Sequence, residues 1–420
     1  MEQIKLEEFN HWWITNKVDE DLALQFKRDI YNIIEKRIEN RFILALTGLR
    51  RVGKTTILYQ LIQNLIEKKV EPTNILFFSF DDNKAEISDI INSYKDFQKK
   101  DFRKERVYIF FDEIQKCVNW ENEIKKYYDL YPKIKFIISG SESLFIKKRM
   151  KETLAGRLFD FVLATFTFNE YLKFNGVNES EFKYETKIKP FLHSFIERGG
   201  FPESLSFKND REFREYIKAL VVDKIVYQDI PKLFKIQDPE FLKVLLELIA
   251  TNPGAYIDYQ SLSKQFDKDR RIIKNYISYL KEGFLINMLG NYRKGSIATL
   301  RKKKRAYPTD NSLIYLYTSN INSDFFGKMV ETCIVNCLNA TTFWKDNGEI
   351  DIIHKGIPIE VKYQEKINFG DFKNLREFMK KFNRHEGILV TKIDEKTIDF
   401  DEGSIKLIPV HKFLLEERYF

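Results

Sequence analysis

The 420-residue sequence contains little cysteine, proline and glycine. Its three cysteines, Cys117, Cys333 and Cys337, are too few for a disulfide framework, which predicts a reducing, cytoplasmic compartment. With 10 Pro and 17 Gly, the chain is neither a flexible linker nor a fibrous repeat protein. No apolar run approaches the ~18 residues that a membrane span needs, and the first residues do not begin a signal peptide. We therefore expect no membrane partner.

The composition is that of a globular protein with a small positive charge. Hydrophobic residues make up 43% and charged residues 31%, which excludes a wholly disordered chain. The 70 Lys+Arg and 62 Asp+Glu give a net charge of +8, which permits a nucleic-acid partner without requiring one. At about 150 residues per domain, the length predicts roughly three domains.

Short apolar runs in the first 170 residues predict a parallel sheet. Four of them, beginning at Phe42, Ile75, Val107 and Lys135, are typical of buried strands, and each is followed by a polar or helical stretch. Strands that alternate with helices indicate an α/β domain. The first forty residues are expected to be helical from a loosely periodic set of apolar side chains, namely Leu22, Leu24, Phe26, Ile30, Ile33 and Ile34.

Residues 48–55 carry a phosphate-binding motif. The segment GLRRVGKT fits G-x-x-x-x-G-K-[ST] and lies between an expected strand and an expected helix. In such a loop the backbone N–H groups and the helix N-terminus bind phosphate, Lys54 reaches the β- and γ-phosphates, and the Thr55 hydroxyl holds Mg²⁺. The sequence therefore predicts a site for ATP and Mg²⁺. Its expected nucleotide-binding residues are Gly48, Arg50, Arg51, Val52, Gly53, Lys54, Thr55, Thr56 and Ser139.

An acidic pair completes this predicted site. The strand that begins at Val107 ends in Asp112, which fits the acid that organises Mg²⁺, and Glu113, which fits the base that polarises the attacking water. A Ras-like GTPase uses glutamine for that water, so Glu113 favours ATP hydrolysis. Ser139 ends the next strand, where its hydroxyl could sense the γ-phosphate, although the start of a loop is an equally good interpretation.

An arginine is expected to neutralise charge that develops in the transition state. Arg157 is the leading candidate, acting either in trans from a neighbouring subunit or in cis. Arg149 and Arg198 are the alternatives. For each of them, an ordinary surface arginine is the default interpretation.

The order of these motifs resembles that of prokaryotic AAA+-like ATPases with a DUF4143-type, nuclease-like C-terminal domain. The resemblance covers nearly the whole chain and implies ATP binding and hydrolysis. It is carried by residues 48–56, Asp112-Glu113-Ile114-Gln115 with Trp120, Ser139-Gly140-Ser141, Leu154-Ala155-Gly156-Arg157 and Arg198-Gly199-Gly200-Phe201-Pro202-Glu203.

Residues 240–290 have the pattern of a winged helix-turn-helix. Three helices are expected, followed by a strand over residues 283–286. Arg270, Arg271 and Lys274 lie at the start of the third helix, where a recognition helix would meet the major groove of DNA. The basic run Arg301–Arg305 suits phosphate contact. The alternatives are a solvated basic face and a protein-interaction module.

The C-terminal region contains a second candidate site. Asp351 and Glu360 lie on two strands of an expected hairpin, and the two-residue period puts Lys362 on the same face as Glu360. A carboxylate pair suits Mg²⁺, and Lys362 could activate the hydrolytic water. With Glu331 on a preceding helix as a further metal ligand, the spacing resembles the PD-(D/E)xK nuclease core. A cross-strand salt bridge is the alternative.

Together these patterns predict an α/β protein that hydrolyses ATP with Mg²⁺ and acts on DNA through its winged helix and C-terminal domain, with a homo-oligomer left open. The alternative is a regulatory ATP switch whose nuclease-like domain is inactive and only holds DNA or a protein. The expected parts are an N-terminal helical segment (1–40), a P-loop NTPase (AAA+-like) core (41–167), a helical lid (168–237), a winged helix-turn-helix (238–310) and a restriction-endonuclease-like α/β domain (311–420).

Overall fold

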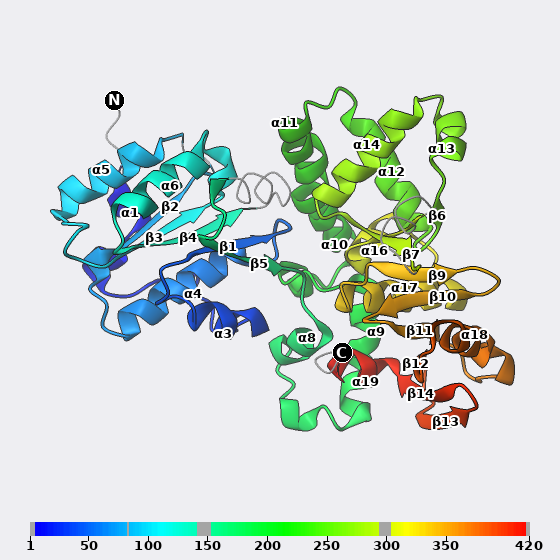
Figure 1. The fold of residues 1–420 in the computed structure, drawn as a ribbon. Coiled ribbons are helices and arrows are strands. Elements are labelled where there is room, and N and C mark those ends of the chain that lie inside the picture. The colour runs from blue at the N-terminus through cyan, green and yellow to red at the C-terminus, as the bar shows by residue number, and fades with distance from the viewer. Residues whose placement is uncertain (1–4, 82–83, 141–152, 294–303, 417–420) are drawn as a thin grey trace. The chain divides into compact units, whose positions relative to one another are not determined.

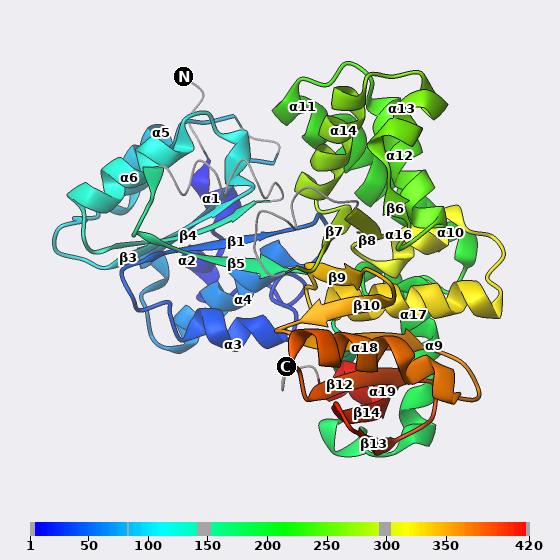
Figure 2. The ribbon, with the colours of Figure 1, turned by 45° about the vertical axis from the view of Figure 1, so that its right-hand side comes forward.

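The computed structural model describes residues 5–81, 84–140, 153–293 and 304–416 (Figure 1). The chain divides into two compact units, Met1–Ala164 and Thr165–Phe420. Figure 2 shows the same ribbon turned by 45°. Several residues that the sequence singles out lie outside the described residues, namely Ser141, Arg149, Arg301, Lys302 and Lys303.

The first unit is built on a parallel sheet with the strand order β2-β3-β4-β1-β5. Its strands are β1 (Ile43–Gly48), β2 (Ile75–Ser79), β3 (Val107–Asp112), β4 (Ile134–Gly140) and β5 (Leu158–Leu163). Helices α5 and α6 lie on one face and α3 and α4 on the other (Figures 1 and 2). The helices of this unit are α1 (Leu6–Phe9), α2 (Trp12–Thr15), α3 (Asp29–Glu35), α4 (Lys54–Glu67), α5 (Ile87–Gln98) and α6 (Trp120–Leu130).

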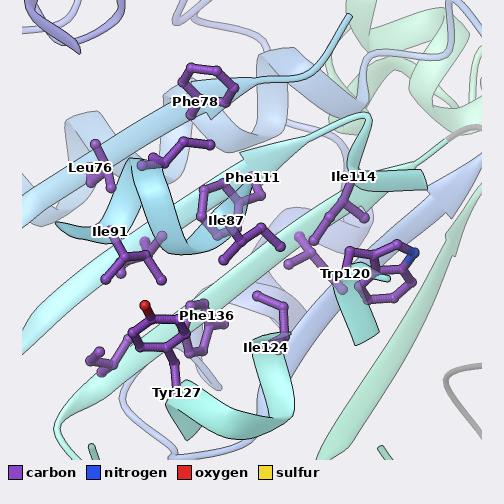
Figure 3. Packing of buried hydrophobic residues seen from close by; sticks show 14 of the residues in the cluster. Leu76, Phe78, Ile87, Ile91, Phe111, Ile114, Trp120, Ile124, Tyr127 and Phe136 are labelled. Carbon is purple, nitrogen blue, oxygen red and sulfur yellow. The ribbon is translucent and has the colours of Figure 1, made fainter. Parts of the chain in front are cut away.

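Aromatic and branched side chains fill the layer between this sheet and helices α5 and α6 (Figure 3). Phe111 of β3 and Phe136 of β4 stack with their ring centroids 6.4 Å apart. Ile91 of α5 and Ile124 of α6 are fully buried in the same cluster. Each such side chain contributes about 1.5–3 kcal/mol by leaving water, so this layer holds the strand ends in fixed positions.

The N-terminal segment is less helical than we expect from its apolar pattern. Leu22, Leu24 and Phe26 lie outside the helices, and Leu22 and Leu24 are exposed. The backbone oxygens of Leu24 and Phe26 accept hydrogen bonds from the Gln60 side chain, at 2.5 and 2.8 Å. These carbonyls satisfy a buried amide on α4 instead of a helical ladder, so the helical prediction is wrong over this stretch.

Strand β5 has no counterpart among the predicted strands. It is the edge strand beside β1, and its side chains alternate irregularly between buried and exposed. Asp160 interrupts its apolar pattern and accepts a hydrogen bond of 3.0 Å from the Thr47 hydroxyl of β1. An edge strand lacks the continuous apolar run that marks a central parallel strand, which explains why sequence periodicity missed it.

The second unit contains a mixed sheet that, within the described residues, has the order β13-β14-β12-β11-β10-β9-β7-β8-β6. Its strands are β6 (Tyr256–Ile257), β7 (Ile286–Asn291), β8 (Lys304–Pro308), β9 (Thr342–Lys345), β10 (Glu349–His354), β11 (Ile357–Lys362), β12 (Glu386–Thr391), β13 (Lys396–Phe400) and β14 (Gly403–Pro409). The parallel pairing of β7 with β9 joins the two modules that the sequence separates at residue 310.

The described helices of the second unit come before, between and after these strands (Figure 2). They are α8 (Phe168–Phe174), α9 (Glu185–Arg198), α10 (Asp210–Tyr216), α11 (Ile230–Phe234), α12 (Pro239–Thr251), α13 (Tyr259–Phe266), α14 (Arg270–Glu282), α16 (Asn311–Tyr317), α17 (Ser323–Cys337), α18 (Lys373–Phe382) and α19 (Val410–Glu416). Over the described residues, every helix is too short or too polar to cross a membrane.

The described residues between 239 and 308 follow the order α12-β6-α13-α14-β7-β8, and β8 pairs antiparallel with both β6 and β7. Strand β7 begins at Ile286 and not at Gly283 as predicted. Gly283 caps α14, and Phe284 then adopts a left-handed backbone with φ 59°. A strand cannot start until the chain leaves this turn.

The Arg198-Gly199-Gly200 segment closes a tight backbone contact in the second unit. Gly200 N–H donates to Asp310 at 3.0 Å, and Phe166 N–H donates to the Gly200 carbonyl at 2.7 Å. A Cβ on Gly200 would lie 2.6 Å from the Phe166 oxygen. The glycine is therefore needed for the close approach of two backbone segments.

Candidate nucleotide site and C-terminal carboxylate cluster

The phosphate-binding motif forms the loop between β1 and α4 in the first unit. Gly48 has φ 154°, and a Cβ there would lie 2.1 Å from the Leu163 oxygen of β5. Gly53 has φ 94° and caps α4, whose first residue is Lys54. Gly48 is needed because of close packing against β5, and Gly53 because of its left-handed backbone conformation. The loop between them leads directly into the N-terminus of α4.

Lys54 points into its own loop. Its Nζ donates to the carbonyl oxygens of Gly48 and Leu49, at 3.2 and 2.8 Å, and lies 3.9 Å from Glu113 Oε1. The side chain is buried, with 5% of the residue exposed. A buried ammonium with these partners is a fixed positive charge at the loop, as phosphate binding requires.

Asp112 of β3 accepts hydrogen bonds from two other elements, α4 and β4. Its Oδ2 accepts a hydrogen bond of 2.7 Å from the Thr55 hydroxyl of α4, and its Oδ1 accepts one from the Ser139 hydroxyl of β4. Burial and the neighbouring Glu113 carboxylate raise the pKa of Asp112. Mg²⁺ takes a few protein oxygens and keeps several waters, so one hydroxyl and one carboxylate fit this ion when phosphates supply further ligands. Thr55 and Asp112 would hold it.

Glu113 follows Asp112 in a strained conformation. Its φ of 51° lies in the left-handed region, and its Oε2 accepts a 2.5 Å hydrogen bond from the Gln115 amide. Non-glycine residues with positive φ cluster at functional sites because the surrounding structure must hold them there. The turn keeps the Glu113 carboxylate beside Lys54.

The other loop residues differ in exposure. Arg51 is exposed and has φ 64°, Arg50 and Thr56 are half-buried, and Val52 is buried. Arg28 also contacts the loop: its guanidinium donates to the carbonyl oxygens of Val52 and Ala164, at 2.9 and 3.0 Å. No local pattern marks this arginine, because its partners lie 24 and 136 residues away.

Arg157 lies at the wrong end of the sheet to act on its own phosphate site. Its carbonyl accepts from Ile43 N–H at the start of β1, whereas the phosphate-binding loop leaves the far end of that strand at Gly48. Six strand residues separate the two ends by roughly 17 Å. The Arg157 guanidinium is paired with Asp129, with Nε and Oδ1 3.0 Å apart. The expectation of an arginine acting in cis is therefore wrong for Arg157.

Arg198, the other described alternative, lies in the second unit. It pairs with Asp210 and donates to the Phe207 carbonyl at 3.2 Å. Both partners are within twelve residues of it, so these contacts stabilise the conformation of the segment that follows α9.

The predicted C-terminal residues do come together on a hairpin. Antiparallel β10 and β11 pair Ile352 with Ile359, which sets Asp351 opposite Glu360. Lys362 Nζ lies 2.9 Å from Glu360 Oε1, and Val361 N–H donates to Asp351 at 3.0 Å. Burial and the nearby Asp351 carboxylate raise the pKa of Glu360 to about 8.

An arginine occupies the carboxylate cluster that we expected to bind metal. Arg305 Nη2 lies 2.7 Å from Glu331 Oε1, and its Nη1 lies 3.3 Å from Asp351 Oδ1. Arg305 is 8% exposed, so the expectation that it contacts DNA phosphate is wrong. Among the described residues, no group of three or more His, Cys, Asp or Glu side chains is arranged to hold a metal ion. As arranged here, the cluster does not fit Mg²⁺.

The basic residues at the start of α14 lie on the surface, outside the buried core. Arg270, Arg271 and Lys274 are exposed, while Ile273 and Ile277 of the same helix are buried. The helix begins at Arg270 after Asp269, whose side chain accepts a hydrogen bond from Arg271 N–H at 2.7 Å. The first turn of this helix therefore presents positive charge to solvent.

The fold and the nucleotide site define the class of the first unit. Residues 40–172 match an AAA domain family (AAA_14), so the chain carries an AAA-type ATPase domain on an α/β fold with a parallel sheet. Residues 190–324 match a domain of unknown function (DUF8612). Over these residues the sequence patterns predicted a helical lid, a winged helix-turn-helix and the start of the C-terminal α/β domain, and the family resemblance implied a DUF4143-type domain.

Relatives occur in both archaea and bacteria. The chain is 26% identical to the uncharacterised protein MJ1637 of Methanocaldococcus jannaschii, over 93% of this chain and 89% of that protein. It is 28% identical to MJ1544 of the same organism, over 61% of this chain, and spans 58% of that protein. An uncharacterised protein of Haemophilus influenzae is 24% identical, over 89% of this chain and 94% of that protein.

Two solved structures show distant likeness. C. elegans PCH-2 matches with a TM-score of 0.29 at 13% identity, covering 47% of this chain and 64% of that one. Drosophila ORC bound to AT-rich DNA and Cdc6 matches with a TM-score of 0.25 at 10% identity, covering 70% and 91%. Scores this low say nothing of function.

Proposed function

We propose that the protein is a Mg²⁺-dependent ATP hydrolase. We also propose that it has a DNA-binding module whose affinity for DNA depends on whether ATP is bound. The main observation in favour of ATP hydrolysis is that the Asp112 carboxylate accepts hydrogen bonds from both Thr55 and Ser139. This contact joins the phosphate-binding loop to the ends of β3 and β4. ATP hydrolysis needs a hydroxyl, an acid and a polar sensor at one place, and these three side chains meet that need.

In the proposed reaction, the loop N–H groups and Lys54 bind the β- and γ-phosphates. Thr55 and Asp112 would hold Mg²⁺, which would neutralise charge on the phosphate oxygens. Glu113 accepts a proton from a water whose oxygen bonds to the γ-phosphorus, while the bond from that phosphorus to the bridging oxygen breaks to leave ADP and phosphate. Arg157 remains a candidate to act in trans, because its guanidinium lies far from the site of its own chain.

The hydrolase is tested by steady-state ATPase assays of Lys54→Ala and Glu113→Gln. We expect each variant to lose on the order of 10²-fold or more in turnover, because each removes a group that acts on the transition state. Glu113→Gln should still bind ATP. Lys69→Ala is the matched control, since Lys69 is exposed just beyond the end of the same helix. Full turnover by Lys54→Ala would refute the assignment.

The DNA-binding module that we propose is a winged helix-turn-helix over residues 239–308. The order of three helices and three strands among the described residues of this range supports it, as does the pairing of β8 with both β6 and β7. Arg270, Arg271 and Lys274 are exposed at the start of the third helix, where they could contact phosphates or bases. A helix of 13 residues is long enough to lie in a major groove.

Metal-dependent cleavage of DNA is the second candidate for the C-terminal strands. The observation that favours it is the meeting of Asp351, Glu360 and Lys362 on one hairpin. Incubation of labelled linear, circular and single-stranded DNA with Mg²⁺ or Mn²⁺ tests it. Cleavage that both Asp351→Ala and Lys362→Ala abolish would support a nuclease. Absence of cleavage on every substrate favours the regulatory ATP switch, in which this domain only holds a partner.

A further inference from the structure

Arg305 is the centre of the carboxylate cluster in the second unit. Its two terminal nitrogens face Glu331 and Asp351, at 2.7 and 3.3 Å, and Nη1 also lies 3.7 Å from Glu349 Oε1. These acids come from α17 and β10, whereas the arginine comes from β8. One guanidinium therefore joins the proposed winged helix to the C-terminal strands.

The surroundings of the guanidinium are shaped to hold it. Its Nε donates to the Gly254 carbonyl at 2.7 Å. Gly254 has φ 79°, and a Cβ there would lie 2.8 Å from Arg305 Nη2 and 3.0 Å from Tyr307 Cε1. The Tyr307 hydroxyl donates to Glu331 Oε1 at 2.6 Å. Glycine is therefore required at the turn between α12 and β6, because the guanidinium and the Tyr307 ring fill the space beside it.

The arginine uses the oxygens that a divalent cation would need. Glu331 Oε1 receives donors from both Arg305 and Tyr307, and Asp351 Oδ1 faces the guanidinium. The side chains are 9% exposed for Arg305, 13% for Glu331 and 16% for Asp351. Water therefore screens the attraction between these charges only weakly. A divalent ion on the same oxygens would be repelled by the positive charge of the guanidinium.

We propose that Arg305 is the resident cation of this cluster and takes the place of a divalent metal. The second unit then folds without metal, and a metal ion can enter only if the guanidinium leaves. This proposal does not depend on ATP hydrolysis. It bears on the second candidate function, because cleavage at Asp351 and Glu360 would require Arg305 to withdraw.

The test is a Mn²⁺ titration of nucleotide-free, full-length protein, followed by the EPR signal of free Mn²⁺. All proteins carry Asp112→Asn, which removes the carboxylate that would hold a metal ion at the phosphate-binding site. With Arg305 present we expect no stoichiometric binding. Arg305→Met, which keeps the bulk of the side chain without its charge, should bind about one Mn²⁺ per chain. Adding Asp351→Asn should abolish that binding.

Two results would overturn the proposal. One is stoichiometric Mn²⁺ binding with Arg305 present that Asp351→Asn removes. The other is an Arg305→Met protein that is folded by circular dichroism and yet gains no Mn²⁺ binding. Should Arg305→Met not fold, thermal unfolding of the protein with Arg305 decides: the same midpoint in EDTA and in millimolar Mn²⁺ supports the proposal. A rise in Mn²⁺ that Asp351→Asn cancels contradicts it.

Discussion

Two buried ionisable residues, Lys135 and Asp310, are surrounded by groups that form hydrogen bonds with them. Lys135 of β4 donates to the carbonyl oxygens of Arg37, Asn40 and Phe42, at 3.2, 2.7 and 2.5 Å. Asp310 accepts from backbone N–H groups of Gly200 and Ser312. Burial of a charge is costly unless such partners are present, so each of these residues fixes the backbone segments around it.

Lys135 should make the stability of the first unit depend on pH. Burial and the Arg106 guanidinium lower the pKa of Lys135 to about 7, from its ordinary 10.5. Between these values the unfolded chain binds a proton that the folded chain does not. Stability should therefore rise with pH from about 7 to 9, by at most about 1.4 kcal/mol per pH unit. Urea unfolding followed by tryptophan fluorescence measures this slope.

The comparison for this prediction is Lys135→Met, which has no titrating group at the site. Its stability is expected to be lower because three carbonyls lose a donor, by about 1–3 kcal/mol. Its slope with pH should be flatter over the same range. Parallel slopes for the two proteins would show that Lys135 does not titrate near pH 7.

At the scale of elements, close contacts with backbone atoms at Gly200 and with side-chain atoms at Gly254 explain why these positions are glycine. The turn after α9 brings Gly200 against Phe166, and the turn after α12 brings Gly254 against Arg305. Both contacts join segments that are far apart in the sequence. Gly327 of α17 is different, since a Cβ there would meet no heavy atom within 4 Å.

Gly200→Ala should therefore destabilise the second unit, whereas Gly327→Ala should not. The added Cβ at residue 200 would lie 2.6 and 2.9 Å from the backbone oxygen and nitrogen of Phe166, which cannot move without shifting the chain. We expect a loss of about 1–3 kcal/mol for Gly200→Ala. For Gly327→Ala we expect no loss or a gain of up to about 1 kcal/mol from helix propensity. Denaturant midpoints provide the measurement, and equal midpoints would contradict the packing argument.

At the scale of the whole molecule, an ATPase domain and a proposed DNA-binding module lie in different compact units. A nucleotide switch requires that ATP binding at one site changes the free energy of DNA binding at the other. By linkage, if ATP changes the affinity for DNA by some factor, DNA must change the affinity for ATP by the same factor. Coupling of this kind is measurable without knowledge of how the units are arranged.

We expect Glu113→Gln with ATP and Mg²⁺ to bind duplex DNA with an affinity about 5-fold or more different from that of the nucleotide-free protein. Arg270→Ala/Arg271→Ala should weaken DNA binding and reduce its salt slope by roughly 0.9 for each phosphate that the variant no longer neutralises. Fluorescence anisotropy over a salt series measures both effects. The matched control is Lys396→Ala/Lys406→Ala, which removes two exposed charges from β13 and β14. An identical slope in both double variants would argue against α14 as the DNA-binding helix.

Local spacing determined most of the nucleotide site. The phosphate-binding loop, Asp112 and Glu113 were predictable because they lie where β1 and β3 end and their chemistry depends on short-range order. Strands β1 to β4 were predictable because central parallel strands are continuously apolar. The hairpin of Asp351 and Glu360 also follows from spacing along two adjacent strands.

Tertiary structure alone decided the partners of charged residues that are distant in sequence. Arg305 looked like part of a basic run, yet its partners lie 26 and 46 residues further along the chain. Arg157 looked like a catalytic residue for the phosphate site of its own chain until the sheet placed it at the opposite end from Gly48. Sequence patterns record periodicity and local chemistry. Which charges meet depends on strand order and on long-range packing, and no short segment encodes either.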